Sequence, residues 1–528
     1  MNRKNLTSAV LAGLAGVAGI AATAQAVNIN PDGLGQVLIY PYYTTNGGNG
    51  TILSVVNTSD NAKAVKVRFT EGQNTREVLD FNLYMSAYDV WTADLEDDDG
   101  TPTLYTNDTT CTVPYIYGDF GGEQAFLPYA LDDGGSTDIS RAAEGHFEMI
   151  EMGTLVGDSA IAATHVEGDP DVNGNTWHPA DCEALVAAWT DPDNTVAGDE
   201  GYWLMDPSTD LEAPSGGLFG GAAVINVNAG TMYSYDAKAI NGFADSVDAN
   251  DFLHQQPGDT RPNLNSGDRM DATVFTDDGQ ALASNGLTRG VDAVSFVFMH
   301  DQIMNEYTTE SNIGALTEWV VTFPTKHFYV YEPSAAATPP LAPFTSVWEG
   351  DGDSLVLPCE VVTLSTIWDR EERSPTESVV PGEERPPIVS PAPPPVNPDV
   401  NPIIPFELCY ETSVIRFGAA DDTLASTEIL GSTNFHNIDN VSLQFDAGWV
   451  RLGMDDYPYD ANQDGQIDGG EAALSRDSLG GLEGLPVTGF SVESFQNAFL
   501  GDGADVLANY GGIFQHKATR KVTQVSVL

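Results

Sequence analysis

Six residues between positions 460 and 471 have the types and spacing that could bind a calcium ion. The stretch DANQDGQIDGGE places oxygen side chains at positions 1, 3, 5, 9 and 12 of a twelve-residue loop. Calcium takes about six to eight oxygen ligands, and a glycine at position 6, here Gly465, permits the sharp turn that wraps them around one ion. The predicted ligands are Asp460, Asn462, Asp464, Gln466 through its backbone carbonyl, Asp468 and Glu471.

The segments on either side of this loop decide what calcium would do. A calcium sensor needs an entering and an exiting helix whose angle can change. Pro458 and the lack of a helical face in residues 453–459 argue against an entering helix, and only residues 472–476 could form a short exit helix. The loop resembles the isolated EF-hand-like and dockerin-type sites of extracellular proteins, which implies that calcium orders a loop.

A partial copy of the loop occurs at residues 169–175, which form either a weak calcium site or an ordinary turn. It has oxygen side chains at positions 1, 3, 5 and 7 and glycine at position 6, but Ala180 at position 12. The acidic clusters at 96–99 and 351–353 are expected to be solvated surface.

Catalytic signatures are missing from the sequence. It contains no GxSxG, HExxH, P-loop or GxGxxG motif in a suitable context. His146 and Glu148 could share one face of a strand, and His165 and His178 lie near acidic residues, but such histidines are more often surface or satisfied polar groups. A glycosidase needs a carboxylate pair, yet nothing selects one pair among 77 acids. We therefore expect no enzyme and no catalytic residues.

The first 26 residues predict export. Arg3 and Lys4 precede an apolar run, and Ala24-Gln25-Ala26 forms a small-x-small cleavage site, which is typical of a signal peptide. No later apolar run is long enough to span a bilayer. Removing Arg3 and Lys4 takes the formal charge from −56 to −58, which excludes nucleic acid as a partner. This charge favours divalent cations, basic partners or a salty medium that screens the repulsion. We expect a secreted, extracellular or cell-surface protein.

Four cysteines in an exported chain favour disulfides over zinc or a catalytic thiol. They allow three pairings in principle. Proximity in the sequence favours Cys111–Cys182 and Cys359–Cys409.

Hydrophobic patterning predicts a mainly β fold, with antiparallel Ig-like β-sandwiches, long acidic loops and a few short helices. In residues 63–70, alternation places Val65, Val67 and Phe69 on one face and Lys66 and Arg68 on the other. A short helix after Pro179 has Asp181 as its N-cap. Strands are expected at 36–43, 51–57, 63–70, 77–84, 88–93, 146–152, 222–228, 231–238, 293–299 and 319–331.

The expected division of the mature chain has two parts. Residues 27–345 form a β-sandwich domain with a large loop-rich insertion at about 95–215, and residues 346–528 form a second β-rich part. The Pro-rich segment 375–405 is either a stiff surface loop between two paired strands or a domain linker, and a Cys359–Cys409 bridge favours the loop.

The final segment from Val506 has no acidic residue. It is either the last strand of the domain or a basic strand that docks onto a neighbouring subunit.

Four segments carry a resemblance to uncharacterised secreted proteins of Gram-negative bacteria that are often described as cell-surface proteins. They are residues 34–45, 54–69, 76–93 and 318–330. The resemblance implies location and carries over no functional residues. We predict a calcium-stabilised structural protein of the cell surface that self-associates into a layer, filament or matrix. The alternative is an adhesin or glycan-binding module that contacts cell-surface polysaccharide, and a secreted hydrolase ranks third.

Overall fold

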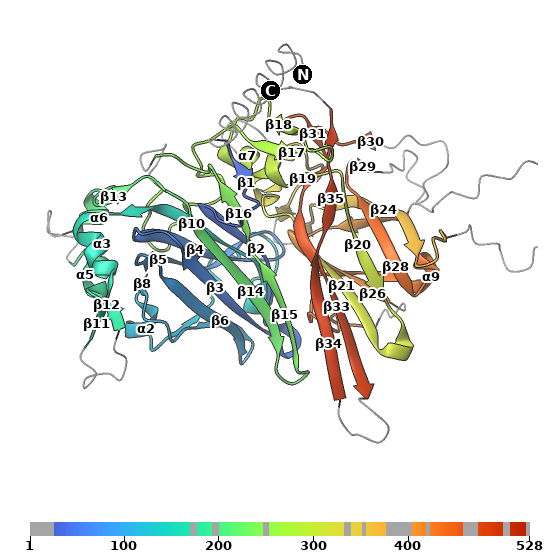
Figure 1. Ribbon diagram of the computed structural model, residues 1–528, viewed down its shortest axis with the longest axis horizontal. Coiled ribbons are helices and arrows are strands. Elements are labelled where there is room, and N and C mark those ends of the chain that lie inside the picture. The colour runs from blue at the N-terminus through green and yellow to red at the C-terminus, as the bar shows by residue number, and fades with distance from the viewer. Residues whose placement is uncertain are drawn as a thin grey trace, which may run out of the picture.

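The fold is described here from a computed structural model. It describes residues 26–168, 177–192, 200–246, 253–331, 339–350, 355–375, 404–418, 423–457, 474–499 and 507–523. The predicted signal peptide and both Asp-rich loops, 460–471 and 169–175, lie outside these residues, except for Ala26. Within the described residues the protein is mainly β, with many antiparallel sheets and a few short helices, as the sequence predicts (Figure 1).

The first pair of sheets comes from the N-terminal half, at the left of Figure 1. One sheet has the order β1-β16-β2-β10-β4-β5-β8, with β13 also pairing with β10, and the other has the order β15-β14-β3-β6-β7-β9. Their facing side chains form one apolar core that includes Val67, Phe147 and Trp91. The strands of the first sheet are β1 (Asn28–Ile29), β16 (Lys238–Asn241), β2 (Val37–Thr44), β10 (Glu144–Leu155), β4 (Lys63–Glu71), β5 (Glu77–Met85), β8 (Cys111–Val113) and β13 (Leu211–Glu212). Those of the second are β15 (Thr231–Asp236), β14 (Leu218–Asn226), β3 (Gly50–Asn57), β6 (Val90–Asp98), β7 (Thr101–Tyr105) and β9 (Glu123–Ala125).

The second pair of sheets lies at the right of Figure 1. Its sheets have the orders β25-β24-β28-β20-β35 and β27-β26-β21-β33-β34, and β26 with β27 is a parallel pair. Trp319, Ile367 and Val450 belong to the core between them. The strands are β25 (Ile404–Leu408), β24 (Glu360–Asp369), β28 (Ala447–Gly453), β20 (Gln302–Thr308), β35 (Lys517–Thr519), β27 (Phe435–Asp439), β26 (Thr412–Gly418), β21 (Ala315–Thr322), β33 (Thr488–Phe499) and β34 (Leu507–Gln515).

The sheet that contains β21 is buried on both faces. Trp319 and Val321 point into the second pair of sheets, whereas Val320 and Phe490 join the apolar core of the first pair. Strand β34 of this sheet also lies close to β15 of the first pair. A Cβ atom added to Gly511 on β34 would lie only 2.5 Å from Cε1 of Tyr233 on β15. The two pairs of sheets therefore share apolar packing.

Strand β4 confirms the predicted alternation, yet every side chain along it is buried. Val65, Val67 and Phe69 face the apolar core, and Lys66 and Arg68 lie on the opposite face. The Lys66 Nζ donates a hydrogen bond to the carbonyl oxygen of Gln256 at 3.2 Å, because a later segment of the chain covers this face. We call this buried, charged side of the first sheet the ion-paired face.

Two predicted strands are wrong in part. Residues 293–299 fall mainly in α7 (Gly290–Phe298), a buried helix, and 319–331 contain the end of β21 followed by α8 (His327–Val330). The Asp292 carboxylate accepts hydrogen bonds from the backbone N–H groups of Thr288 and Arg289, and this local cap starts the helix. The predicted helix after Pro179 is α5 (Cys182–Ala187), and the Asp181 side chain caps it as expected.

The two pairs of sheets do not divide at the expected boundary, residue 345, because strands before it already belong to the second pair. Strands β20 and β21 pair with β28, β26 and β33, so they belong to the second pair of sheets. The region 95–215, expected as a loop-rich insertion, contributes β10 to the middle of the first sheet. Such long-range pairings have no local signature in the sequence.

The remaining elements are short. The helices are α2 (Ile116–Asp119), α3 (Gly157–Ala163), α6 (Tyr202–Met205) and α9 (Asn440–Leu443), with 3-10 turns at Asn46–Gly48, Ile139–Ala143 and Ser311–Ile313. The two-stranded pairs are β11 (His165–Glu167) with β12 (Trp177–Pro179), β17 (Thr273–Phe275) with β18 (Ala281–Ala283), β19 (Met299–His300) with β32 (Leu485–Pro486), β22 (Glu349–Gly350) with β23 (Leu355–Val356), β29 (Asp456–Tyr457) with β30 (Leu474–Ser475), and β31 (Leu482–Glu483) with β36 (Lys521–Val522). None of the helices in the described ranges has the length and apolar character that a membrane span requires.

The acid-free C-terminal segment pairs within its own chain over residues 507–522. Strands β34, β35 and β36 pair with β33, β20 and β31. Lys521 forms ion pairs with Asp455 and Glu483, each at 2.8 Å. This part of the segment therefore pairs within its own fold, which agrees with the first of the two alternatives.

Candidate functional site

The predicted calcium ligands lie outside the described residues, but the short strands that flank their loop are described. Asp456 pairs with Ser475 and Tyr457 with Leu474 in an antiparallel hairpin, β29 with β30. The exit helix expected at 472–476 is wrong for Leu474 and Ser475, because pairing with β29 holds them extended. The nearest described residues on the two sides of the loop therefore pair with each other.

The base of this hairpin is attached to the second pair of sheets by Arg476. Its guanidinium forms a fully buried ion pair with Glu360 on β24, and its Nε donates to the carbonyl oxygen of Met454 at 2.9 Å. Glu360 also accepts hydrogen bonds from the N–H and hydroxyl of Thr345, at 2.8 and 2.9 Å. Arg476 therefore links the end of the hairpin to strand β24.

The partial copy at 169–175 has a similar setting. Its flanks, β11 and β12, pair antiparallel, with Glu167 opposite Trp177. His165 lies here too, with its Nδ1 3.0 Å from the hydroxyl of Ser86. The Nδ1 of His178 lies 2.7 Å from the carbonyl oxygen of Pro179. Both histidines therefore have structural hydrogen-bond partners.

Both predicted disulfides are confirmed. Cys111 on β8 bonds to Cys182 in α5, and Cys359 bonds to Cys409 across the ends of β24 and β25. Because β24 and β25 pair antiparallel, the Pro-rich segment connects two neighbouring strands of one sheet, as the loop interpretation requires. Most of that segment, 376–403, lies outside the described residues.

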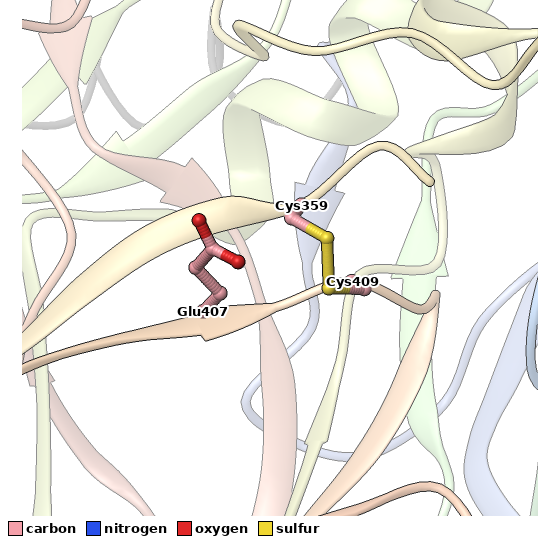
Figure 2. Close-up of side chains that lie close together, drawn as sticks. All are labelled: Cys359, Glu407 and Cys409. Carbon is pink, nitrogen blue, oxygen red and sulfur yellow. A yellow bond between two sulfur atoms is a disulfide. The ribbon is translucent and has the colours of Figure 1, made fainter. Parts of the chain in front are cut away.

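The carboxylate of Glu407 lies beside the second disulfide (Figure 2). Two cysteines and a glutamate could bind a soft metal ion if both sulfurs were thiolates. Here the sulfurs are bonded to each other, so only one carboxylate remains as a ligand. We interpret the group as a structural bridge.

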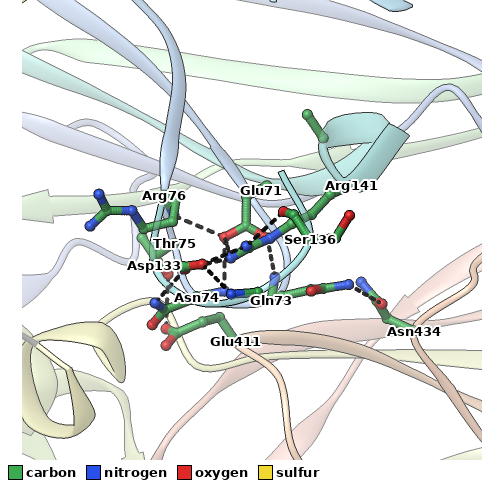
Figure 3. Close-up of polar contacts among 12 residues, drawn as sticks. Glu71, Gln73, Asn74, Thr75, Arg76, Asp133, Ser136, Arg141, Glu411 and Asn434 are labelled. Carbon is green, nitrogen blue, oxygen red and sulfur yellow. Dashed lines mark hydrogen bonds and ion pairs between the residues drawn. The ribbon is translucent and has the colours of Figure 1, made fainter. Parts of the chain in front are cut away.

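A buried ionic network joins the two pairs of sheets, and sequence reasoning missed it (Figure 3). Arg141 forms ion pairs with Glu71 at the end of β4, at 2.8 Å, and with Asp133, at 2.7 Å. All three side chains are at most 1% exposed. Although burial alone would raise the pKa of Asp133, hydrogen bonds from Arg141 and Asn74 outweigh it and lower that pKa.

The network continues into the second pair of sheets. The indole nitrogen of Trp348 donates to the carbonyl oxygen of Asp133 at 2.8 Å, and the hydroxyl of Thr75 donates to Glu411 at 2.8 Å. Burial raises the pKa of Glu411 and lowers that of its neighbour Lys326, so each is pushed toward its neutral form. The acids involved are far apart in the sequence, which is why no motif reveals them.

Two further buried carboxylates hold the loop 427–434 at the junction. Glu144, from β10, accepts hydrogen bonds from the backbone N–H groups of Thr433 and Asn434, at 2.8 and 3.1 Å. Glu318, from β21, accepts from those of Ile429 and Leu430, at 2.7 and 3.0 Å. Burial raises the pKa of Glu318 to about 7. One loop is therefore bound by an acid from each half of the molecule.

The His146–Glu148 pair suggested by alternation lies on the ion-paired face. Glu148 forms an ion pair with Arg68, and burial raises its pKa. Burial also lowers the pKa of His146 to about 3, so this histidine is neutral at ordinary pH. Both residues are nearly inaccessible to solvent, at 1% and 4% exposure, which favours a role in packing.

A hollow of about 770 Å³ lies on the second sheet. The turn at 45–50, Asp94 and Glu96 on β6, and Ile225 on β14 contribute to its walls. Burial, with help from the charge of Glu96, raises the pKa of Asp94. Residues 96–99 are exposed, as expected for a solvated acidic cluster.

Comparisons with protein-family models, with curated proteins and with solved structures found no match for the chain.

Proposed function

We propose that the protein is an exported structural component of the cell surface, stabilised by calcium and able to self-associate into a layer, filament or matrix. The junction between the two pairs of sheets supports this proposal most directly. Buried acids from both halves bind the same loop, 427–434, and the halves also share apolar packing. Such a unit suits a load-bearing building block, because relative motion of its halves would break buried hydrogen bonds to carboxylates.

The negative charge and the predicted calcium site together explain how self-association would depend on cations. The mature chain carries a large negative charge, so its copies repel one another until cations screen or bridge them. A calcium ion in the 460–471 loop would stabilise the β29–β30 hairpin, and the Arg476–Glu360 ion pair connects that hairpin to β24. Calcium would therefore favour both the folded subunit and the contact between subunits.

Glycan binding is the second candidate function, supported by exposed aromatic side chains in the region 95–215. Tyr129 is 83% exposed and Trp177 is 54% exposed. Exposed aromatic rings can stack on sugar faces. Binding on a glycan array that disappears in Tyr129→Ala and Trp177→Ala would favour this function over the structural one.

Replacing two calcium ligands, in Asp460→Asn with Glu471→Gln, should abolish the stabilisation of the protein by calcium. A ligand that binds only the folded state adds about 1.4 kcal/mol at ten times its dissociation constant, which corresponds to a few degrees in melting temperature. Melting curves with calcium and with a chelator measure the difference. The control variant, Glu183→Gln with Asp191→Asn, removes two exposed acids and should keep the full calcium response. If wild-type melting does not respond to calcium, the calcium site is refuted.

A further inference from the structure

A small cleft of about 170 Å³ opens on the ion-paired face of the first sheet. Arg76, Glu77, Glu148, His327 and Tyr331 are among the residues that line it. A cleft of this size suits one small molecule.

One side of the cleft carries excess negative charge. Glu77 and Glu148 share a single cation, Arg68, whose Nε lies 2.7 Å from the Glu77 carboxylate and whose Nη1 contacts Glu148. The neighbouring Lys66 is already paired with Asp80. Two cations thus face three carboxylates, which leaves one negative charge.

The other side carries a positive charge that no described carboxylate neutralises. The Arg76 Nε donates a hydrogen bond to the carbonyl oxygen of Ala130, and the guanidinium lies 5.3 Å from the centre of the Tyr331 ring. Figure 3 shows this guanidinium pointing away from the Glu71 and Arg141 side chains. Within the described part of the chain, no ion pair of Arg76 is present. Its two terminal nitrogens can therefore donate to a ligand.

His327 adds no charge to the cleft. Burial lowers its pKa to about 3, and its Nδ1 lies 3.3 Å from the side-chain oxygen of Asn74. The N–H on Nδ1 therefore donates to Asn74, which leaves Nε2 as an acceptor. The cleft as a whole combines one excess negative charge, one excess positive charge and a neutral acceptor.

We propose that this cleft binds a free α-amino acid, with the ligand carboxylate on Arg76 and its ammonium group on the Glu77 carboxylate. A guanidinium fits a carboxylate through two parallel hydrogen bonds, and an ammonium group offers three donors to carboxylate oxygens. Binding of a dipolar molecule neutralises both excess charges at once. A neutral sugar neutralises neither. The inference does not depend on calcium binding or on self-association.

Isothermal titration of the mature protein with each of the common amino acids tests the proposal. We expect at least one to bind, and we expect its N-acetyl and carboxamide derivatives to bind at least about tenfold more weakly, because each loses one charged contact. Arg76→Gln and Glu77→Gln should each weaken binding by a similar factor. The control, Arg370→Gln, changes an exposed arginine elsewhere and should leave affinity unchanged.

Three results would overturn the proposal: no amino acid binds, both blocked derivatives bind as well as the free amino acid, or Arg76→Gln binds like the wild type. Tighter binding of glucose or galactose than of any amino acid would also reject it. The blocked derivatives are tested on the wild-type protein, so this arm does not depend on whether a variant folds. Melting curves of each variant establish that it is folded.

Discussion

Arg141→Ala is expected to lower the free energy of unfolding by about 4 kcal/mol. Removing one partner of a buried ion pair costs about 3–5 kcal/mol, because the remaining charge is left buried without compensation. Here the substitution leaves two such carboxylates, Glu71 and Asp133, inside the junction. Denaturant unfolding followed by tryptophan fluorescence would measure the change.

Arg370→Ala is the matched control for this prediction. Arg370 forms an ion pair with Glu310 at 2.7 Å, the same distance as between Arg141 and Asp133, but its side chain is 57% exposed. Exposed pairs contribute about 0–1 kcal/mol because water solvates the separated charges. If Arg141→Ala costs no more than Arg370→Ala, the ionic network does not stabilise the junction.

Glu318→Gln should remove a pH dependence of about 3 kcal/mol between pH 5 and pH 8. Burial raises the pKa of Glu318 from 4.5 to about 7. The folded state therefore holds the proton more tightly than the unfolded state does. The associated stability is fully present below pH 4.5 and is lost as the pH rises through 7. A glutamine cannot ionise, so the variant keeps its stability over this range.

The measurement for Glu318 is the difference in unfolding free energy between pH 5 and pH 8, compared between the wild type and the variant. Other raised acids, such as Glu411, contribute equally to both proteins and cancel. Glu310→Gln, at an acid that is 26% exposed and paired with the exposed Arg370, should retain the wild-type slope. If the unfolding free energies of the wild type and Glu318→Gln change with pH in parallel, the raised pKa of Glu318 is contradicted.

The strands of the first pair of sheets could be predicted because their signals are local. Residues 63–70 alternate, turn residues separate neighbouring strands, and Asp181 precedes its helix as a cap. Helix α7 was missed because an apolar run that is buried all round has no periodicity to separate helix from strand. The Asp292 cap was the signal that could have identified it.

The junction and the cleft could not be predicted, because they combine residues that are distant in the sequence. Glu71 and Arg141 are 70 positions apart, and Glu144 and Thr433 are 289 apart. An acid-rich chain offers many such combinations, and only the strand register selects among them. The disulfides were predicted correctly because proximity in the sequence happened to coincide with proximity in space.

Sedimentation velocity of the purified protein, in calcium and in excess chelator, tests the proposed calcium-dependent self-association. We expect large assemblies in millimolar calcium that return to monomers when calcium is removed, because a bound cation would order the 460–471 loop and offset the negative charge. A protein that remains monomeric at every calcium and salt concentration would contradict it.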